Sequence, residues 1–328
     1  MELPTPRPRI ALLTTGGTIA GVAASSTATG YQAGVIGPQA LLAAVPELAD
    51  VADVRAEQLF ALDSKNMSDA LMLQLARRAS ELLAGDDVAG LVITHGTDTL
   101  EESAYLLHLL LKSAKPVVLT GAMRPGNALS ADGPANLYQS VCVAASPRAA
   151  GLGVLVVMDG AIWSARDVRK QDAAALHAFG SPYGPLGRMA GHSPRFYRAP
   201  ARPHTLQSQF SLQGLQALPP VAIVSAWAGM SATPYAALAT AGMRGIVHAG
   251  MGAASVPDHL LPTLRDLRLP IVRASRTGAG PLLPRDAGAT PEWLIADDQT
   301  PLQARLLLAL GLAHGTSAAA LQELFMRY

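Results

Sequence analysis

Short apolar runs alternate along the chain with polar turns and with longer amphipathic segments. The run at 91–93 places Leu, Val and Ile together, as in a strand buried on both faces, and a polar turn follows at once. An acidic first turn and later apolar residues then predict a helix that begins near Asp98 or Thr99. The same rhythm predicts strands at 10–13, 51–62, 115–119 and 153–158, and helices at 38–45, 68–83 and 132–145.

A change of composition separates two such regions. Residues 180–220 contain many Pro, Gly, His and Arg residues and show little periodicity, and the alternation resumes at 221–224. Because alternating strands and helices require a mostly parallel sheet, the sequence predicts an α/β protein. We expect a larger N-terminal domain, with a mostly parallel sheet and helices on both faces, and a smaller C-terminal α/β domain. The predicted bounds are 1–197 for the first domain, 198–219 for a linker and 220–328 for the second domain.

Composition and charge restrict the possible partners. The chain has 328 residues, of which 50% are hydrophobic and 15% are charged, and its formal net charge is +1. So weak a charge predicts neither a nucleic-acid partner nor a membrane-surface partner, and no apolar run approaches the roughly 20 residues of a membrane helix. The first nine residues lack the apolar core of a signal peptide, and Cys142 is the single cysteine. We therefore expect a cytoplasmic protein.

The turn after the first predicted strand is rich in glycine. Gly16 and Gly17 allow a ligand to approach the main chain closely, but the turn lacks both the dinucleotide fingerprint and the Gly-Lys-Ser/Thr of a P-loop. The eight histidines are scattered, and no Cys/His cluster has metal-ligand spacing. The sequence therefore predicts neither a cofactor nor a metal.

Hydroxyl-bearing and ionisable side chains gather where the predicted strands end. In a parallel sheet these ends share one edge, where ligands bind. A hydroxyl becomes a nucleophile only if a neighbouring group takes its proton, such as a lysine with a lowered pKa or a tyrosine. The pattern thus predicts metal-free covalent catalysis by a hydroxyl. The candidate residues are Thr15, Ser64, Thr97, Asp98 and Lys170, together with Tyr31, which follows a small polar segment suited to a lid.

Several of these candidates also have a purely structural explanation. Thr97 and Asp98 can cap the helix that follows them. Tyr31 can be an ordinary surface tyrosine, and Lys170 can be a solvated cation within the charged segment 166–170. The residue pattern alone leaves these alternatives open.

Five motifs follow one another along nearly the whole chain: TTGGTIAG at 14–21, THGTDT at 94–99, TGAMRP at 120–125, SADGPAN at 130–136 and RDVRK at 166–170. Together they resemble the successive signatures of the bacterial L-asparaginase family, most closely its type II branch. The resemblance implies hydrolysis of a side-chain amide, that of L-asparagine, to a carboxylate and ammonia without a cofactor. It also implies a homotetramer built as a dimer of dimers, in which each site is completed by a neighbour's C-terminal domain.

The resemblance also implies a role for each catalytic candidate. Thr15 corresponds to the nucleophile, and Tyr31 corresponds to the lid residue that polarises it. Thr97 corresponds to a second hydroxyl, with Lys170 as its base and Asp98 as the acidic partner.

Further positions correspond to the family's substrate contacts. Ser64 and Asp98 match its contacts to the α-carboxylate and the α-amine, and the main chain at Thr97 and Ala122 matches its oxyanion-binding region. The residue after Ser64 is usually Gln or Glu in the family and helps to hold the substrate's ammonium. Here it is Lys65, which would repel that ammonium if it points inward.

Two more departures concern the substrate's ammonium and the rim of the site. Close relatives contribute a Glu from the partner subunit, and Asp286 is the candidate to replace it here. Ser255 stands where many relatives have Asn, at a polar position that adjoins the site. Because the longer substrate depends more on accurate anchoring, these departures predict low glutaminase activity relative to asparaginase activity.

Two other classes of function stay open. The chain can be a related amidohydrolase that acts on glutamine, on D-asparagine, or on a peptide- or tRNA-linked amide, although its near-neutral charge argues against tRNA. It can also be an amino-acid-binding protein that keeps the fold without turnover. Two activatable hydroxyls argue against that alternative, because a sensor needs neither.

Overall fold

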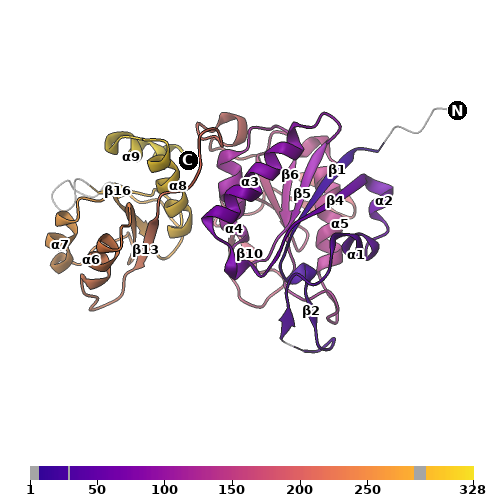
Figure 1. Cartoon of the computed structure of the whole chain (residues 1–328), viewed down its shortest axis with the longest axis horizontal. Coiled ribbons are helices and arrows are strands. Elements are labelled where there is room, and N and C mark those ends of the chain that lie inside the picture. The colour runs from indigo at the N-terminus through magenta and orange to yellow at the C-terminus, as the bar shows by residue number, and fades with distance from the viewer. Residues whose placement is uncertain (1–6, 29, 284–292) are drawn as a thin grey trace. The chain divides into compact units, whose positions relative to one another are not determined.

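The computed structural model describes residues 7–28, 30–283 and 293–328 (Figure 1). The chain divides into two compact units, Met1–Leu212 and Gln213–Tyr328, and the predicted linker at 198–219 spans their boundary. Each unit contains a sheet flanked by helices, which confirms the predicted α/β class. Among the described residues, no helix combines the length and the apolar character that crossing a membrane requires.

The first unit is organised around an eight-stranded sheet with the order β12-β11-β8-β7-β6-β5-β1-β4. The strands from β7 to β4 run parallel, while β8, β11 and β12 form an antiparallel extension at one edge. The strands are β1 (Arg9–Gly16), β4 (Asp53–Leu62), β5 (Gly90–Thr94), β6 (Val117–Thr120), β7 (Val154–Met158), β8 (Ala161–Ser164), β11 (Gly187–Ala190) and β12 (Ser193–Phe196).

Helices cover both faces of this sheet, as predicted: α3 and α4 lie on one face, and α1, α2 and α5 lie on the other (Figure 1). Because neighbouring residues of a strand point to opposite faces, alternate positions such as Ile10 and Leu12 of β1 join one core with Leu137 and Val141 of α5. These helices are α1 (Pro38–Ala43), α2 (Leu48–Val51), α3 (Asp69–Ala84), α4 (Leu100–Leu110) and α5 (Gly133–Ala144).

Several short elements join or extend these layers at the strand ends. Two two-stranded antiparallel pairs, β2 with β3 and β9 with β10, carry residues that the sequence singles out. The short elements are β2 (Val22–Ala23), β3 (Tyr31–Gln32), β9 (Arg169–Lys170) and β10 (Phe179–Gly180), with the 3-10 helices η1 (Thr18–Ala20), η2 (Ser64–Asn66), η3 (Pro147–Ala149) and η4 (Thr205–Gln207).

The second unit contains a four-stranded parallel sheet with the order β13-β14-β15-β16. Ile246 of β14 joins the core beneath α6 and α7, whereas a Cβ on the preceding Gly245 would lie 2.7 Å from Leu308 of α8, on the opposite face. The elements are β13 (Val221–Ser225), α6 (Thr233–Thr240), β14 (Gly245–Gly250), η5 (Asp258–Leu260), α7 (Leu261–Asp266), β15 (Ile271–Ser275), β16 (Leu294–Ile295), α8 (Pro301–Ala313) and α9 (Ala318–Arg327).

The structure differs from the prediction mainly in short elements. The region at 180–220, expected to lack regular structure, contains the four-residue strands β11 and β12. These strands were missed because short strands with partly exposed polar residues lack a continuous apolar run. The helices α2 and α9 were also absent from the prediction.

Candidate active site

Three turns converge at the carboxyl edge of the parallel strands. Gly17 has φ 76°, and a Cβ at this position would lie 2.4 Å from the Cα of Gly96. A Cβ on Gly96 would in turn lie 2.4 Å from Ser64 Oγ. Only glycines allow the turns after β1 and β5 to pack together at this distance. The residues that follow these strands are therefore held next to one another.

Lys170 joins the two reactive residues of the β5 turn. Its Nζ donates to Thr97 Oγ1 at 2.9 Å and contacts Asp98 Oδ1 at 2.8 Å. The Lys170 side chain is 19% exposed, so it is not a solvated surface cation. Thr99 occupies the N-cap position of α4, and no side-chain cap bond is formed there. Thr97 and Asp98 are therefore directed toward Lys170 rather than serving as helix caps.

Ser64 lies directly against this turn. Its Oγ accepts a hydrogen bond from the Asp98 N–H at 3.3 Å, and its carbonyl accepts one from Thr99 Oγ1 at 3.0 Å. The next residue, Lys65, forms an ion pair with Asp63 at 3.0 Å, and its side chain is 68% exposed. The ion pair with Asp63 is the largest cause of the raised pKa of Lys65. A partner outside the β5 turn thus holds the Lys65 ammonium.

The β1 turn contributes two buried threonines with different partners. Thr15 Oγ1 donates to the Thr94 carbonyl at 3.0 Å, and the residue is 1% exposed. Thr18 Oγ1 lies 2.6 Å from the hydroxyl of Tyr31. The structure thus places Tyr31 against Thr18 and not against Thr15. Thr18 was not among the predicted site residues, although it belongs to the same glycine-rich motif.

Five of the residues described above line one cavity of about 580 Å³: Thr18, Tyr31, Thr97, Asp98 and Lys170. Lys170 and Arg124 bring positive charge to its wall, and Asp98, whose side chain is 56% exposed, brings negative charge. A cavity with both signs of charge suits a zwitterionic amino acid. Its lining residues are Thr18, Ser26, Thr27, Ala28, Tyr31, Thr97, Asp98, Met123, Arg124, Pro125, Ala128, Leu129, Lys170, Ala173 and Ala174.

Asp132 shapes the wall of the cavity that follows β6. Its two carboxylate oxygens accept the N–H groups of Met123 and Arg124, each at 2.9 Å. Asn136 Nδ2 donates to the Gly121 carbonyl at 3.0 Å. Ala122 is completely buried between these contacts. The loop is therefore held by its main chain, leaving the Arg124 side chain at the cavity.

Glu101 is a further residue of the site that the sequence did not reveal. It lies in the first turn of α4, and its Oε2 accepts the main-chain N–H of Lys170 at 2.8 Å. Burial raises the pKa of Glu101 to about 7, although the bond from Lys170 acts in the opposite direction. Acidic residues in a first helical turn are common, so its sequence position gave no signal of this contact.

His95, at the start of the β5 turn, has a structural role. Its Nδ1 lies 2.8 Å from the Gly96 carbonyl, and its Nε2 lies 3.0 Å from Ser103 Oγ. Burial lowers the pKa of His95 to about 4, so the ring is neutral at pH 7. A neutral ring with its proton on Nδ1 donates to Gly96 and accepts from Ser103. His95 thereby fixes the turn without supplying charge.

Four sequence candidates of the first unit are not among the residues that line this cavity: Thr15, Ser64, Lys65 and Ala122. Ser255 lies in the second unit, where its carbonyl is 3.0 Å from His248 Nε2. Asp286 lies outside the described residues. Within the described ranges, no group of three or more His, Cys, Asp or Glu side chains is placed to hold a metal ion.

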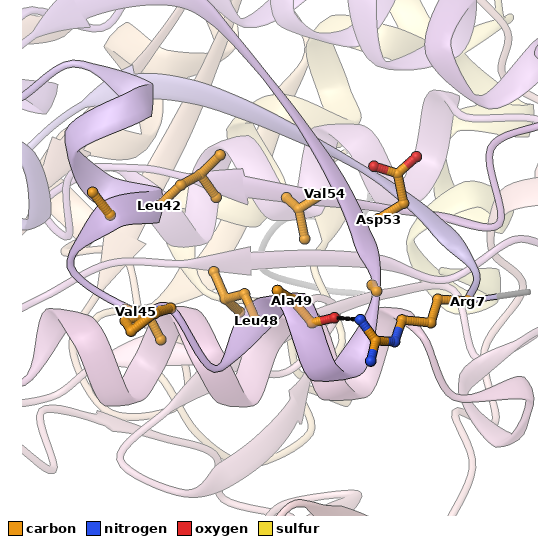
Figure 2. A pocket seen from close by; sticks show the side chains of 10 residues that line it. Arg7, Leu42, Val45, Leu48, Ala49, Asp53 and Val54 are labelled. Atoms are coloured by element: carbon orange, nitrogen blue, oxygen red, sulfur yellow. Dashed lines mark hydrogen bonds between the residues drawn. The ribbon is translucent and has the colours of Figure 1, made fainter.

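A second hollow in the first unit has a different character. This groove of about 640 Å³ lies between α1, α2 and the start of β4, and Figure 2 shows Leu42, Val45 and Leu48 along it. Arg7 donates to the Ala49 carbonyl at its edge. The lining is apolar apart from Arg7 and Asp53, so the groove contains none of the hydroxyl groups described above.

Comparisons with known proteins identify the family of the chain. Residues 9–202 match the family described as Asparaginase, N-terminal, and residues 220–325 match the Glutaminase/Asparaginase C-terminal domain. The chain is 42% identical over 335 residues to a glutaminase-asparaginase of Pseudomonas fluorescens biotype A, covering 100% of this chain and 92% of the relative. It is 42% identical over 326 residues to L-asparaginase 2 of Bacillus subtilis, and the match covers 98% of this chain and 87% of that relative.

A solved structure is similar over the same extent. The crystal structure of a probable cytoplasmic L-asparaginase from Campylobacter jejuni has a TM-score of 0.95 and 41% sequence identity, and the match covers 98% of this chain and 100% of that one. Both domains of the family are therefore present, in the expected order. The chain belongs to the L-asparaginase/glutaminase-asparaginase family of amidohydrolases, whose substrates are amino-acid amides.

Proposed function

We propose that this amidohydrolase converts L-asparagine to L-aspartate and ammonia through a threonine acyl-enzyme. One observation carries the proposal: Lys170 Nζ lies 2.9 Å from Thr97 Oγ1 and 2.8 Å from Asp98 Oδ1, and all three residues line the same cavity. A hydroxyl, an amine and a carboxylate in contact form a proton relay of the kind that activates a hydroxyl nucleophile or a water molecule.

In the first step, Thr15 Oγ1 attacks the side-chain amide carbon. The ester bond forms, the amide C–N bond breaks, and the threonine proton leaves with the nitrogen as ammonia. Thr15 must give up its bond to the Thr94 carbonyl to reach the substrate. Tyr31 contacts Thr18 in the structure, so it must turn toward Thr15 to polarise the attacking hydroxyl. The main chain at Thr97 and Ala122 stabilises the negative charge that develops on oxygen.

In the second step, water hydrolyses the ester and releases aspartate. Thr97, with Lys170 as its base, takes the proton of this water, and Asp98 orients the Lys170 side chain. Ser64 and Asp98 hold the α-carboxylate and the α-amine of the substrate. The half-exposed carboxylate of Asp98 suits that contact, since it can bind the substrate's ammonium as well as Lys170.

We further propose that asparagine is preferred to glutamine. Lys65 is paired with Asp63 and offers no carboxylate or amide to the substrate's ammonium, so anchoring depends more on Asp98. The longer glutamine side chain is more sensitive to weak anchoring. The second candidate is an enzyme that uses both amides equally. It is favoured by the relatives from Pseudomonas and Acinetobacter that are called glutaminase-asparaginase.

Ammonia release from L-asparagine and L-glutamine by the purified chain tests both proposals. We expect hydrolysis of asparagine, with a lower kcat/KM for glutamine. Thr15→Ala and Thr97→Val should each lower kcat by at least about a thousandfold. The matched control is Thr240→Val, on the exposed face of α6, which should leave both constants unchanged. Undiminished turnover by Thr15→Ala would exclude Thr15 as the nucleophile, and equal efficiencies would exclude the preference for asparagine.

The assembly and the compartment belong to the same proposal. We propose a homotetramer built as a dimer of dimers, in which Ser255 and Asp286 of one subunit adjoin the site of another. Sedimentation of the purified chain measures the mass of the assembly. The cytoplasmic location stays a prediction. Among the relatives, the Campylobacter jejuni protein is called cytoplasmic and one from Haemophilus influenzae is called periplasmic.

A further inference from the structure

The cavity lies between two separate segments of the first unit. One is the hairpin segment 21–32, which contains β2 and β3 and carries Tyr31. The other is the loop segment 121–131, which follows β6 and carries Arg124. Both segments supply residues to the cavity lining. The distance between them therefore determines the width of the cavity.

Asn127 joins these two segments with both ends of its side-chain amide. Its Oδ1 accepts the N–H of Ala23 at 2.8 Å, and its Nδ2 donates to the carbonyl of the same residue at 2.8 Å. The amide thus pairs with the outer edge of β2 as a neighbouring strand would. Two main-chain bonds flank this pair: Gly126 N–H donates to the Gly21 carbonyl at 2.9 Å, and Leu129 N–H donates to the Ser26 carbonyl at 3.0 Å.

The contact at Ala23 leads directly to Tyr31. Ala23 and Tyr31 are partners in the antiparallel register of β2 and β3. The hydroxyl of Tyr31 then reaches Thr18 at 2.6 Å inside the cavity. A series of contacts therefore runs from Asn127 through its hydrogen bonds to Ala23, across the strand pair to Tyr31, and through the Tyr31 hydroxyl to Thr18.

We propose that Asn127 is a positioning residue that fixes the Tyr31 hairpin at the cavity and thereby sets the affinity for the amide substrate. Asparagine is suited to this position because its side chain both accepts and donates, as Ala23 requires. In Asn127→Asp the side chain has the same size and can still accept the Ala23 N–H. Its second carboxylate oxygen replaces the Nδ2 donor and faces the Ala23 carbonyl, so that bond is lost. Alanine removes both bonds while the two flanking main-chain bonds can persist.

The expected kinetic effect follows from the fraction of molecules in which the hairpin segment is held against the loop segment. If the hairpin contacts the 121–131 loop for only a fraction of the time, the apparent affinity for substrate is the intrinsic affinity multiplied by that fraction. Once substrate is bound, it holds the hairpin in place, so the rate of the bound complex changes little. Two lost hydrogen bonds correspond to a change of roughly five- to tenfold. Asn127→Ala should therefore raise KM for L-asparagine about five- to tenfold and change kcat less than about twofold. Asn127→Asp should act in the same direction.

Hydrogen exchange tests the positioning without relying on activity. In Asn127→Ala and Asn127→Asp, the amides of a peptide covering 20–32 should exchange faster than in the wild-type chain, while the amides of the sheet strands stay unchanged. The control is Gln74→Ala, which removes an amide from the exposed face of α3 and should alter neither exchange nor kinetics. Thermal denaturation of each variant identifies any general loss of folding.

The kinetic part rests on the proposed amide hydrolysis, but the exchange part does not. Unchanged exchange at 20–32 in both Asn127 variants would overturn the proposal, as would a fall in kcat with no change in KM. A wild-type chain that hydrolyses no amide would instead refute the proposed function. In that case faster exchange in the variants would still support the role of Asn127 in holding the hairpin.

Discussion

Lys170 shows how strongly the surroundings of one residue depend on tertiary contacts. Its neighbours in sequence form the charged segment 166–170, which is typical of a solvated surface. In the fold, β9 places its main chain against Glu101 and its ammonium between Thr97 and Asp98. The residue is thus held at both its backbone and its side chain, as a group with a defined chemical role requires.

The residue-scale prediction concerns the base. Lys170→Met removes the only amine in contact with Thr97 among the described residues, and we expect kcat to fall by about 10²–10⁴ with folding retained. Lys170→Arg retains the charge and can still contact Asp98, but a guanidinium does not give up its proton. It should therefore be almost as inactive as the methionine variant. Steady-state ammonia release measures both, and near-normal activity of Lys170→Arg would show that only the charge is required.

The candidate residues that carry reactive groups could be predicted because the turns containing them follow the strands in sequence. The motifs identified Thr15, Thr97 and Lys170, but their partners depend on packing between segments far apart in the chain. Neither the contact of Glu101 with the Lys170 main chain nor the bond between Thr18 and Tyr31 has a local sequence signal. Both contacts arise only when the folded chain brings these segments together.

At the scale of elements, the first turn of α4 connects stability to the site. Glu101 is partly buried there, with Glu102 as an acidic neighbour and the Lys170 N–H as its hydrogen-bond donor. Its pKa in the folded chain is about 7, above the ordinary value of 4.5. The folded state therefore favours the protonated carboxyl, and the unfolded state releases the proton at lower pH.

This difference predicts a pH-dependent gain in stability for Glu101→Gln. Well below pH 4.5 the Glu101 carboxyl is protonated in both the folded and the unfolded state, so it does not change the free energy of unfolding. As pH rises from about 4.5 to 7, only the unfolded chain ionises, so the wild-type chain loses stability, whereas glutamine does not titrate. The variant should gain up to ~3 kcal/mol relative to wild type by pH 8, and its Oε1 can still accept the Lys170 N–H. Denaturant unfolding between pH 5 and 8 measures the difference, and a gap that stays constant or narrows would contradict the burial of Glu101.

Elements with strong patterns were predictable, and short ones were not. The fully buried strands β5 and β7 and the helix α3, capped by Ser68, lie within a residue or two of their predicted bounds. The strands β8, β11 and β12 were missed because they are four residues long and extend the sheet through antiparallel pairing. Such pairing depends on the sheet that is already formed, not on a local alternation of polar and apolar residues.

For the whole molecule, the two domains match the family over nearly their full length, and the strand ends of the first unit bring the proposed catalytic groups to one edge. Thr15 lies at the end of β1 and contacts the carbonyl of Thr94 at the end of β5, the strand beside it. Thr97 follows that strand and binds Lys170. The parallel arrangement of β1 and β5 therefore brings the two threonines to the same edge of the sheet.

Mass spectrometry of the chain quenched in acid during turnover of L-asparagine tests the central claim most directly, because it identifies the oxygen that forms the covalent bond. The account predicts an aspartyl ester on Thr15 that disappears in Thr15→Ala, with none on Thr18 or Thr97. An ester on either of those residues, or ammonia release without any ester, would contradict it.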